Sequence, residues 1–94
     1  MKAKFIREVE NWTGKAFLCK VTPPMEYETK EERKKTTKYI IVSATHVPFS
    51  GDETYIFPAT SKGIVINWIE LEGSFKGDCD HKRALANAGY TELE

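Results

Sequence analysis

Short runs of β-branched and aromatic residues, each ended by turn residues, limit what this chain can fold into more than any other feature. The clearest run is Tyr39–Thr45, which reads Tyr-Ile-Ile-Val-Ser-Ala-Thr. Such residues favour strands, and the continuous apolar start predicts a central strand that is buried on both faces. Shorter runs at 16–21, 53–57 and 64–66 have the same character and lie between Gly, Pro, Asn and Asp residues. The pattern predicts several short strands joined by turns.

The first segment, 4–9, is ambiguous. Its three apolar residues fit one helical turn as well as a strand, because their spacing follows neither period cleanly. We favour a strand, since Asn11–Gly14 is typical of a turn and a second run of strand-forming residues follows it. Pro23 and Pro24 predict the end of that second strand, because proline donates no hydrogen bond to a sheet.

The middle and last parts of the chain complete the expected architecture. Residues 60–63 resemble a hairpin connection, with Gly63 supplying a positive φ, and 64–66 return as a strand. A short helix at 81–88 is predicted, with Asp78 or Asp80 as its N-cap and Gly89 as its left-handed C′ residue. The expectation is therefore an α+β fold, an antiparallel sheet of four to five strands with one short C-terminal helix. The large apolar residues expected to contribute most to the core are Trp12, Tyr39, Ile41, Tyr55, Phe57, Ile66 and Trp68.

Length and composition predict one soluble domain over residues 1–94. The chain has 94 residues, of which 40% are hydrophobic, as in a globular domain rather than a disordered segment. No apolar run approaches the roughly 20 residues of a membrane helix, and charges occupy the start, where a secretion signal is apolar. With only two cysteines, a disulfide framework is not expected. These features predict a cytoplasmic protein.

The formal net charge is zero, but the charge is unevenly distributed. Residues 1–38 carry ten Lys and Arg against six Glu, and residues 39–94 carry four against eight acidic residues. Much of the positive charge lies at 30–38, within a polar segment, 26–37, that we expect to form a flexible charged loop. The plainest interpretation is a solvated loop, and the alternative is a contact for phosphates or an acidic partner. The candidate binding residues are Arg33, Lys34, Lys35 and Lys38.

One cluster, Gly77–His81, has residues that could carry chemistry. Cys79 stands near the start of the expected helix, where the helix dipole favours a thiolate, and His81 could act as its base. However, Asp78 and Asp80 flank the thiol and oppose its ionisation. We expect capping aspartates around a cysteine with a pKa near its ordinary value, and no catalytic residue.

No metal or cofactor site is expected. Cys19, Cys79, His46 and His81 suit zinc by type, but their spacing matches no zinc knuckle. The chain also contains no phosphate-binding loop, dinucleotide fingerprint, serine hydrolase elbow or metalloprotease helix motif. These patterns predict that the protein is not an enzyme and binds no cofactor.

From Trp12 onwards the chain resembles short, uncharacterised proteins encoded by bacteriophages and prophages. The matching residues are Trp12-Thr-Gly, Pro23-Pro24, Tyr39–Ala44, Phe49–Ala59, Asn67–Leu71, Gly73-Ser74, Gly77, Asp80-His81, Ala84-Leu85 and Ala88–Tyr90. The resemblance implies a phage-borne accessory protein in the cytoplasm of a bacterial host, and it brings no activity or site residues.

Two functions of different classes remain at this stage. The first is a non-catalytic protein-interaction protein, a phage accessory factor whose partner is a host or phage protein. The second is a small nucleic-acid-binding protein that uses the basic stretch Lys30–Lys38. Phosphate contacts weaken steeply with salt, whereas a protein contact need not.

Overall fold

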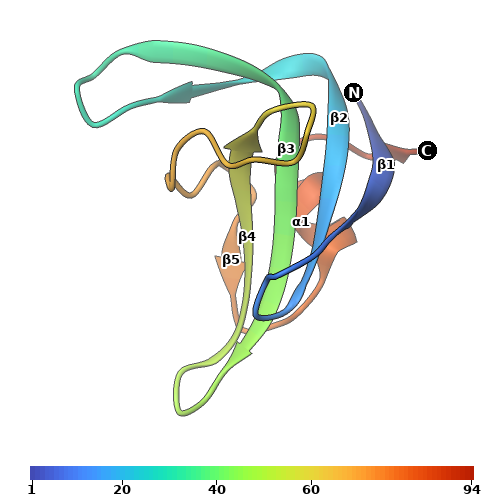
Figure 1. Ribbon diagram of the computed structural model, residues 1–94, viewed down its shortest axis with the longest axis vertical. Coiled ribbons are helices and arrows are strands. Elements are labelled where there is room, and N and C mark those ends of the chain that lie inside the picture. The colour runs from blue at the N-terminus through green and yellow to red at the C-terminus, as the bar shows by residue number, and fades with distance from the viewer.

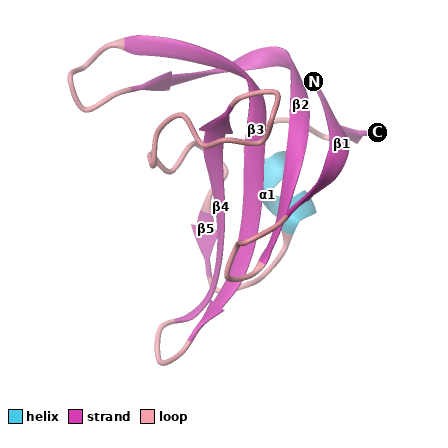
Figure 2. Ribbon diagram, viewed as in Figure 1, coloured by secondary structure: helices cyan, strands magenta, loops and turns pink.

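A computed structural model describes all 94 residues as one curled sheet with a short helix on one face (Figures 1 and 2). The elements are β1 (Lys2–Val9), β2 (Lys15–Glu28), β3 (Lys34–Val47), β4 (Gly51–Ala59), β5 (Phe75–Lys76), α1 (His81–Asn87) and β6 (Glu92–Leu93). The strands lie in the order β5-β4-β3-β2-β1-β6. All neighbouring strands are antiparallel except β1 and β6, which are parallel.

The expected fold class is wrong. The molecule is mostly sheet, with 53% of its residues in strands and 7% in the helix, and its six strands form a curled, mixed half-barrel. The two strands that the sequence did not predict, β5 and β6, are two residues long each. Strands of two residues are too short to show a side-chain periodicity in the sequence. They form only where a loop and the C-terminal residues reach the two edges of the sheet.

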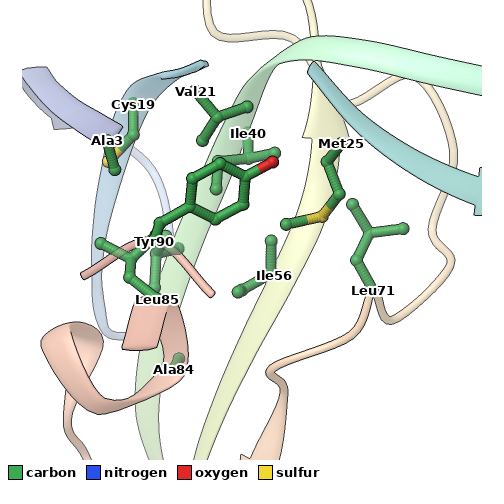
Figure 3. Close-up of a cluster of buried hydrophobic side chains, with 11 residues drawn as sticks. Ala3, Cys19, Val21, Met25, Ile40, Ile56, Leu71, Ala84, Leu85 and Tyr90 are labelled. Atoms are coloured by element: carbon green, nitrogen blue, oxygen red, sulfur yellow. The ribbon is translucent and has the colours of Figure 1, made fainter. Parts of the chain in front are cut away.

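β3 is the central strand, and both of its faces are buried as its sequence predicts. Ile40 and Val42 belong to the core on the α1 side, whereas Ile41 belongs to a smaller core on the other side, and all three are fully buried. Figure 3 shows the larger core, in which the Tyr90 ring lies near Ile40 and Val21 and Leu85 of α1 lies beneath Tyr90. Side chains alternate across a strand, so a strand with covers on both sides needs an unbroken apolar run.

β2 does not end at its prolines. It continues to Glu28, and the register with β3 shifts between Lys20 and Met25, so Pro23 and Pro24 fall in the irregular part of the ladder. A bulge is where a strand tolerates residues that donate no hydrogen bond. Much of the segment expected as a flexible loop, 26–37, is therefore the end of the β2–β3 hairpin.

The segment after β4 does not return as a strand. Only Val65 forms a bridge, to Ala59, and Gly63 has the expected positive φ of 83° in the turn before it. Residues 60–68 instead cross the face of the sheet opposite α1, where Val65 packs against the smaller core (Figure 1). Ile69 and Leu71 pack against the core on the α1 side. Leu71 then anchors the segment, because it is buried and its N–H donates to Ile56 at 2.8 Å.

The helix begins and ends as its sequence predicts. Asp80 is the N-cap and accepts from the N–H of Arg83, at 3.0 Å. Gly89 has φ 95°, and the N–H of Tyr90 donates to Leu85 at 2.8 Å, as in a Schellman motif. At seven residues this helix is too short to cross a bilayer, and the structure has no other helix.

The close approach of Gly73 to α1 gives a first prediction. Gly73 has φ 103°, and a Cβ there would lie 2.4 Å from the backbone oxygen of Ala84. Gly77 has a similar φ of 111°, but a Cβ there would have open space around it. Gly77→Ala should destabilise the fold by about 1 kcal/mol through its left-handed backbone alone. Gly73→Ala should cost roughly 1–3 kcal/mol more, because α1 must move. Chemical denaturation of both variants measures the difference, and equal losses would show that α1 does not pack against Gly73.

Candidate binding groove

The face of the sheet opposite α1 is only partly covered, and the uncovered part is a cavity of about 680 Å³. We call this cavity the aromatic groove. Its floor comes from β3 and β4, and its walls come from the β1–β2 turn and from residues 63–68. The lining residues are Asn11, Trp12, Thr13, Ser43, Thr45, Tyr55, Phe57, Gly63, Ile64, Val65 and Trp68. None of them carries a formal charge at neutral pH.

Three aromatic rings from separate parts of the chain meet in the groove. The Trp12 and Trp68 ring centroids lie 5.5 Å apart, and Phe57 lies 6.0 Å from Trp12 and 5.3 Å from Trp68. Each pair is tilted or edge-to-face, as aromatic rings prefer. Tyr55 extends the row, because its centroid lies 6.1 Å from that of Phe57. Both tryptophans of the chain therefore lie at this groove.

Backbone geometry places three of these rings. Trp12 follows Asn11, which has a positive φ of 67° in the β1–β2 turn, a conformation that asparagine adopts more readily than most residues. Tyr55 and Phe57 are two residues apart on β4, so their side chains point to the same face of the sheet.

A row of exposed apolar side chains borders the groove. Ile64, Ile66 and Trp68 are 63%, 54% and 70% exposed, and they alternate along one extended stretch. We call them the apolar strip. The expectation that Ile66 and Trp68 belong to the core is wrong, because the segment crosses the sheet face as a loop and turns alternate side chains to solvent.

The other expected core residues divide into two groups. Ile41 and Phe57 are buried, which confirms that part of the prediction. Trp12, Tyr39 and Tyr55 are only partly buried, since they line or border the uncovered face. Alternation in the sequence identifies a buried face of a strand, but it does not report how completely the covering layer extends over it.

The backbone next to the strip is unpaired. The N–H and C=O groups of residues 67–70 make no backbone hydrogen bond, and Ile66 donates inward to Pro58 at 2.9 Å. Exposed backbone groups of this kind can pair with an added strand.

The charged groups around the groove are placed asymmetrically. Glu53 lies on the same face of β4 as Tyr55, and Glu70 follows Trp68 by two residues. Partial desolvation, an O–H donated to Glu53 and the charges of Glu53 and Glu70 together raise the pKa of Tyr55 to about 12. Neither carboxylate forms a salt bridge, since the two ion pairs of the structure are elsewhere. At the opposite end, the Arg7 guanidinium lies beside Gly63 and donates to the Lys62 carbonyl at 2.7 Å.

The basic residues singled out from the sequence lie outside the groove. Arg33, Lys34, Lys35 and Lys38 are exposed at the far part of the β2–β3 hairpin. Lys34 stands opposite Glu28 and Lys35 opposite Tyr27. Five basic and four acidic residues share the stretch 26–38, so its net charge is only +1. Acidic residues are therefore interspersed with the basic ones along the hairpin, and one of them, Glu28, stands opposite Lys34.

Cys79 and His81 are close in sequence but do not form a nucleophile and base. The His81 Nε2 hydrogen-bonds with the Lys15 carbonyl at 2.9 Å, and its ring packs edge-on against Phe17. Partial desolvation, with the charges of Asp52 and Asp78, raises the pKa of Cys79. The pKa of Cys79 is therefore above the ordinary value that we expected, because Cys79 precedes the N-cap of a very short helix and the helix dipole does not offset these effects.

The residues considered for zinc are dispersed. Cys19 is fully buried in the α1-side core, where desolvation raises its pKa to about 12. His46 lies at the far end of β3 and pairs with Asp52. No three His, Cys, Asp or Glu side chains lie together in a way that could hold a metal ion.

Comparison with protein-family models, curated proteins and solved structures finds no match to this chain. The groove is therefore interpreted from its own geometry.

The contrast between a buried and an exposed ring of the cluster gives a second prediction. Phe57 is 8% exposed and Trp68 is 70% exposed. Phe57→Ala should lower the free energy of unfolding by about 3–5 kcal/mol, as for buried aromatic residues. Trp68→Ala should cost about 1 kcal/mol, because little surface is removed from burial. Urea denaturation measures both, and a Trp68→Ala loss as large as that of Phe57→Ala would place Trp68 in the core.

A third prediction concerns Tyr55. Its pKa of about 12 means that the fold favours the neutral phenol. The stability that Tyr55 contributes is thus complete below about pH 10 and is lost as the pH rises towards 12. The tyrosinate absorbance of the protein minus that of Tyr55→Phe gives its titration. Glu53→Gln should shift the midpoint downward, and an unshifted midpoint near 10 in the native protein would contradict the placement of Glu53.

Proposed function

We propose that the protein is a non-catalytic interaction protein and that the aromatic groove and apolar strip receive an extended segment of a partner protein. The observation that carries the proposal is the exposure of Trp68, Ile64 and Ile66 beside a preformed cavity. Contiguous exposed apolar surface marks interaction sites, and tryptophan is among the residues that contribute most to binding.

An extended segment suits this surface better than a compact one. The apolar strip alternates along extended backbone, and the backbone of 67–70 has free donors and acceptors. A partner strand that pairs with this edge gains main-chain hydrogen bonds, and its alternate side chains reach the groove. The resemblance to phage proteins makes a host or phage protein the expected source of that segment.

Nucleic acid is the less favoured partner. Phosphate contacts dominate the affinity of such proteins, and the uncharged lining of the groove offers none. The unpaired charges that lie nearest to Tyr55 are the carboxylates of Glu53 and Glu70, which repel phosphates.

A displayed library of random 12-residue peptides provides the fourth prediction. Selected peptides should bind the native protein and change the fluorescence of its two tryptophans, both of which lie at the groove. Trp68→Ala should weaken the binding of a selected peptide by at least about tenfold, as expected for a central anchor residue. The control variant Lys34→Ala/Lys35→Ala should bind as the native protein does.

Two results would contradict the proposal. One is a set of peptides whose affinity Trp68→Ala leaves unchanged. The other is binding of a dT12 oligonucleotide that falls steeply with salt and is weakened in Lys34→Ala/Lys35→Ala, since that would identify the hairpin as a phosphate contact.

A further inference from the structure

Two carboxylates that form no salt bridge, Glu53 and Glu70, lie beside Tyr55 at one end of the aromatic groove. Glu53 is half-buried on β4 and faces the same side as Tyr55, with Thr45 opposite it on β3. Thr45 and Tyr55 both line the groove, so the carboxylate of Glu53 stands at the margin of the lining.

Glu70 reaches the same end from the loop. It lies two residues after Trp68, and the two line a smaller neighbouring cavity of about 430 Å³, together with Lys30 and Glu28 of the β2–β3 hairpin. The charge of Glu70 acts on the Tyr55 hydroxyl, as does that of Glu53. The hydrogen bond from the Leu71 N–H to the Ile56 carbonyl holds Glu70 beside β4, near Tyr55. Glu53 lies two residues before Tyr55 on that strand, so the two carboxylates approach Tyr55 from different elements.

The protein's own cations form no salt bridge with these carboxylates, although Lys76 of β5 stands opposite Glu53 in the ladder. Lys30 lines the neighbouring cavity but forms no ion pair there, and Glu28 lines the same cavity. Arg7 lies at the Gly63 end of the groove, and its guanidinium is already bonded to the carbonyls of Lys62 and Glu8.

The rings complete the chemistry of this end. The Trp68 ring, which is mostly exposed, and the Phe57 and Tyr55 rings lie along the groove in sequence. The face of an aromatic ring attracts a cation, most strongly for tryptophan, and the attraction grows when the cation loses water. A cavity with aromatic walls and unpaired carboxylates at one end is complementary to a side chain with a long apolar stem and a positive tip.

We infer that the partner segment carries a lysine or arginine side chain that enters the aromatic groove at its Tyr55 end, with the charged tip between Glu53 and Glu70. This inference rests on the proposed function. It specifies the partner as an extended segment with a basic residue for the groove and an apolar residue for the strip. Neutral and acidic segments should bind more weakly.

The test uses the peptides selected on the native protein, measured on the full chain. They should be enriched in Lys or Arg at one fixed position relative to an apolar residue. Replacement of this basic residue by norleucine, which keeps an apolar stem but removes the charge, should weaken binding about tenfold. Glu53→Gln/Glu70→Gln should weaken the basic peptide by a similar factor and should leave the norleucine peptide unaffected. Glu72→Gln, an exposed glutamate of the same loop outside the groove lining, is the matched control and should change nothing.

The outcomes of the two proposals can be told apart. Peptides that lose affinity in Trp68→Ala but carry no conserved cation, or that bind Glu53→Gln/Glu70→Gln as tightly as the native protein, would overturn the inference and leave the proposed function standing. Peptides that are indifferent to Trp68→Ala would overturn both. Circular dichroism of the two glutamine variants should match that of the native protein, so a loss of binding reports the charge alone.

Discussion

The burial of β3 on both faces is the constraint on which the rest of this molecule depends. Its residues alternate between the core under α1 and the smaller core on the opposite side, and Ile40, Ile41 and Val42 are fully buried. A strand of this kind cannot leave either face to water, so the chain must supply two covers. The C-terminal region, with Ile69 and Leu71, supplies one, and the loop at 60–68 contributes to the other.

The two covering layers differ in how completely they bury the sheet, and the incomplete one leaves the aromatic groove open. On the α1 side, Leu85 and Tyr90 close the core, and the Tyr90 hydroxyl donates to the Pro23 carbonyl at 2.8 Å. On the other side, Val9, Val65 and two partly buried rings, Trp12 and Tyr39, pack against Ile41 and its neighbours. A loop held to β4 by one bridge and a few backbone hydrogen bonds seals a sheet face less completely than a packed helix does. The incomplete seal exposes Trp68, and the chain tolerates this because the inner rings still protect β3.

The sequence predicts the features that depend on local patterns, and it does not predict those that depend on contacts between distant segments. The central strand, the N-cap Asp80 and the C′ residue Gly89 follow from local patterns and are confirmed. The six-stranded half-barrel was not predicted, because β5 and β6 are defined by where distant segments meet the sheet edges. β2 continued past Pro23 and Pro24 because a bulge absorbs residues that donate no hydrogen bond.

The candidate site was not predictable in the same way. The sequence draws attention to the lysine stretch and to Cys79 and His81, whose residue types signal chemistry, and the structure brings none of these together. The groove residues Trp12, Phe57 and Trp68 were identified as core, since apolar character is the same signal for a core residue and for a binding residue. Only the exposed fraction separates the two roles, and that fraction depends on the path of residues 60–72.

The most direct measurement of the central claim, an open aromatic face with a negative end, is collisional quenching of the two tryptophans by ions of opposite charge. Caesium and iodide should be compared at equal ionic strength, with N-acetyltryptophanamide as the reference, because every tryptophan of the chain lies at the groove. We expect efficient quenching by caesium, a smaller relative effect of iodide, and loss of the difference in Glu53→Gln/Glu70→Gln. Tryptophans shielded from both ions, or quenched better by iodide, would contradict an open face with a negative end.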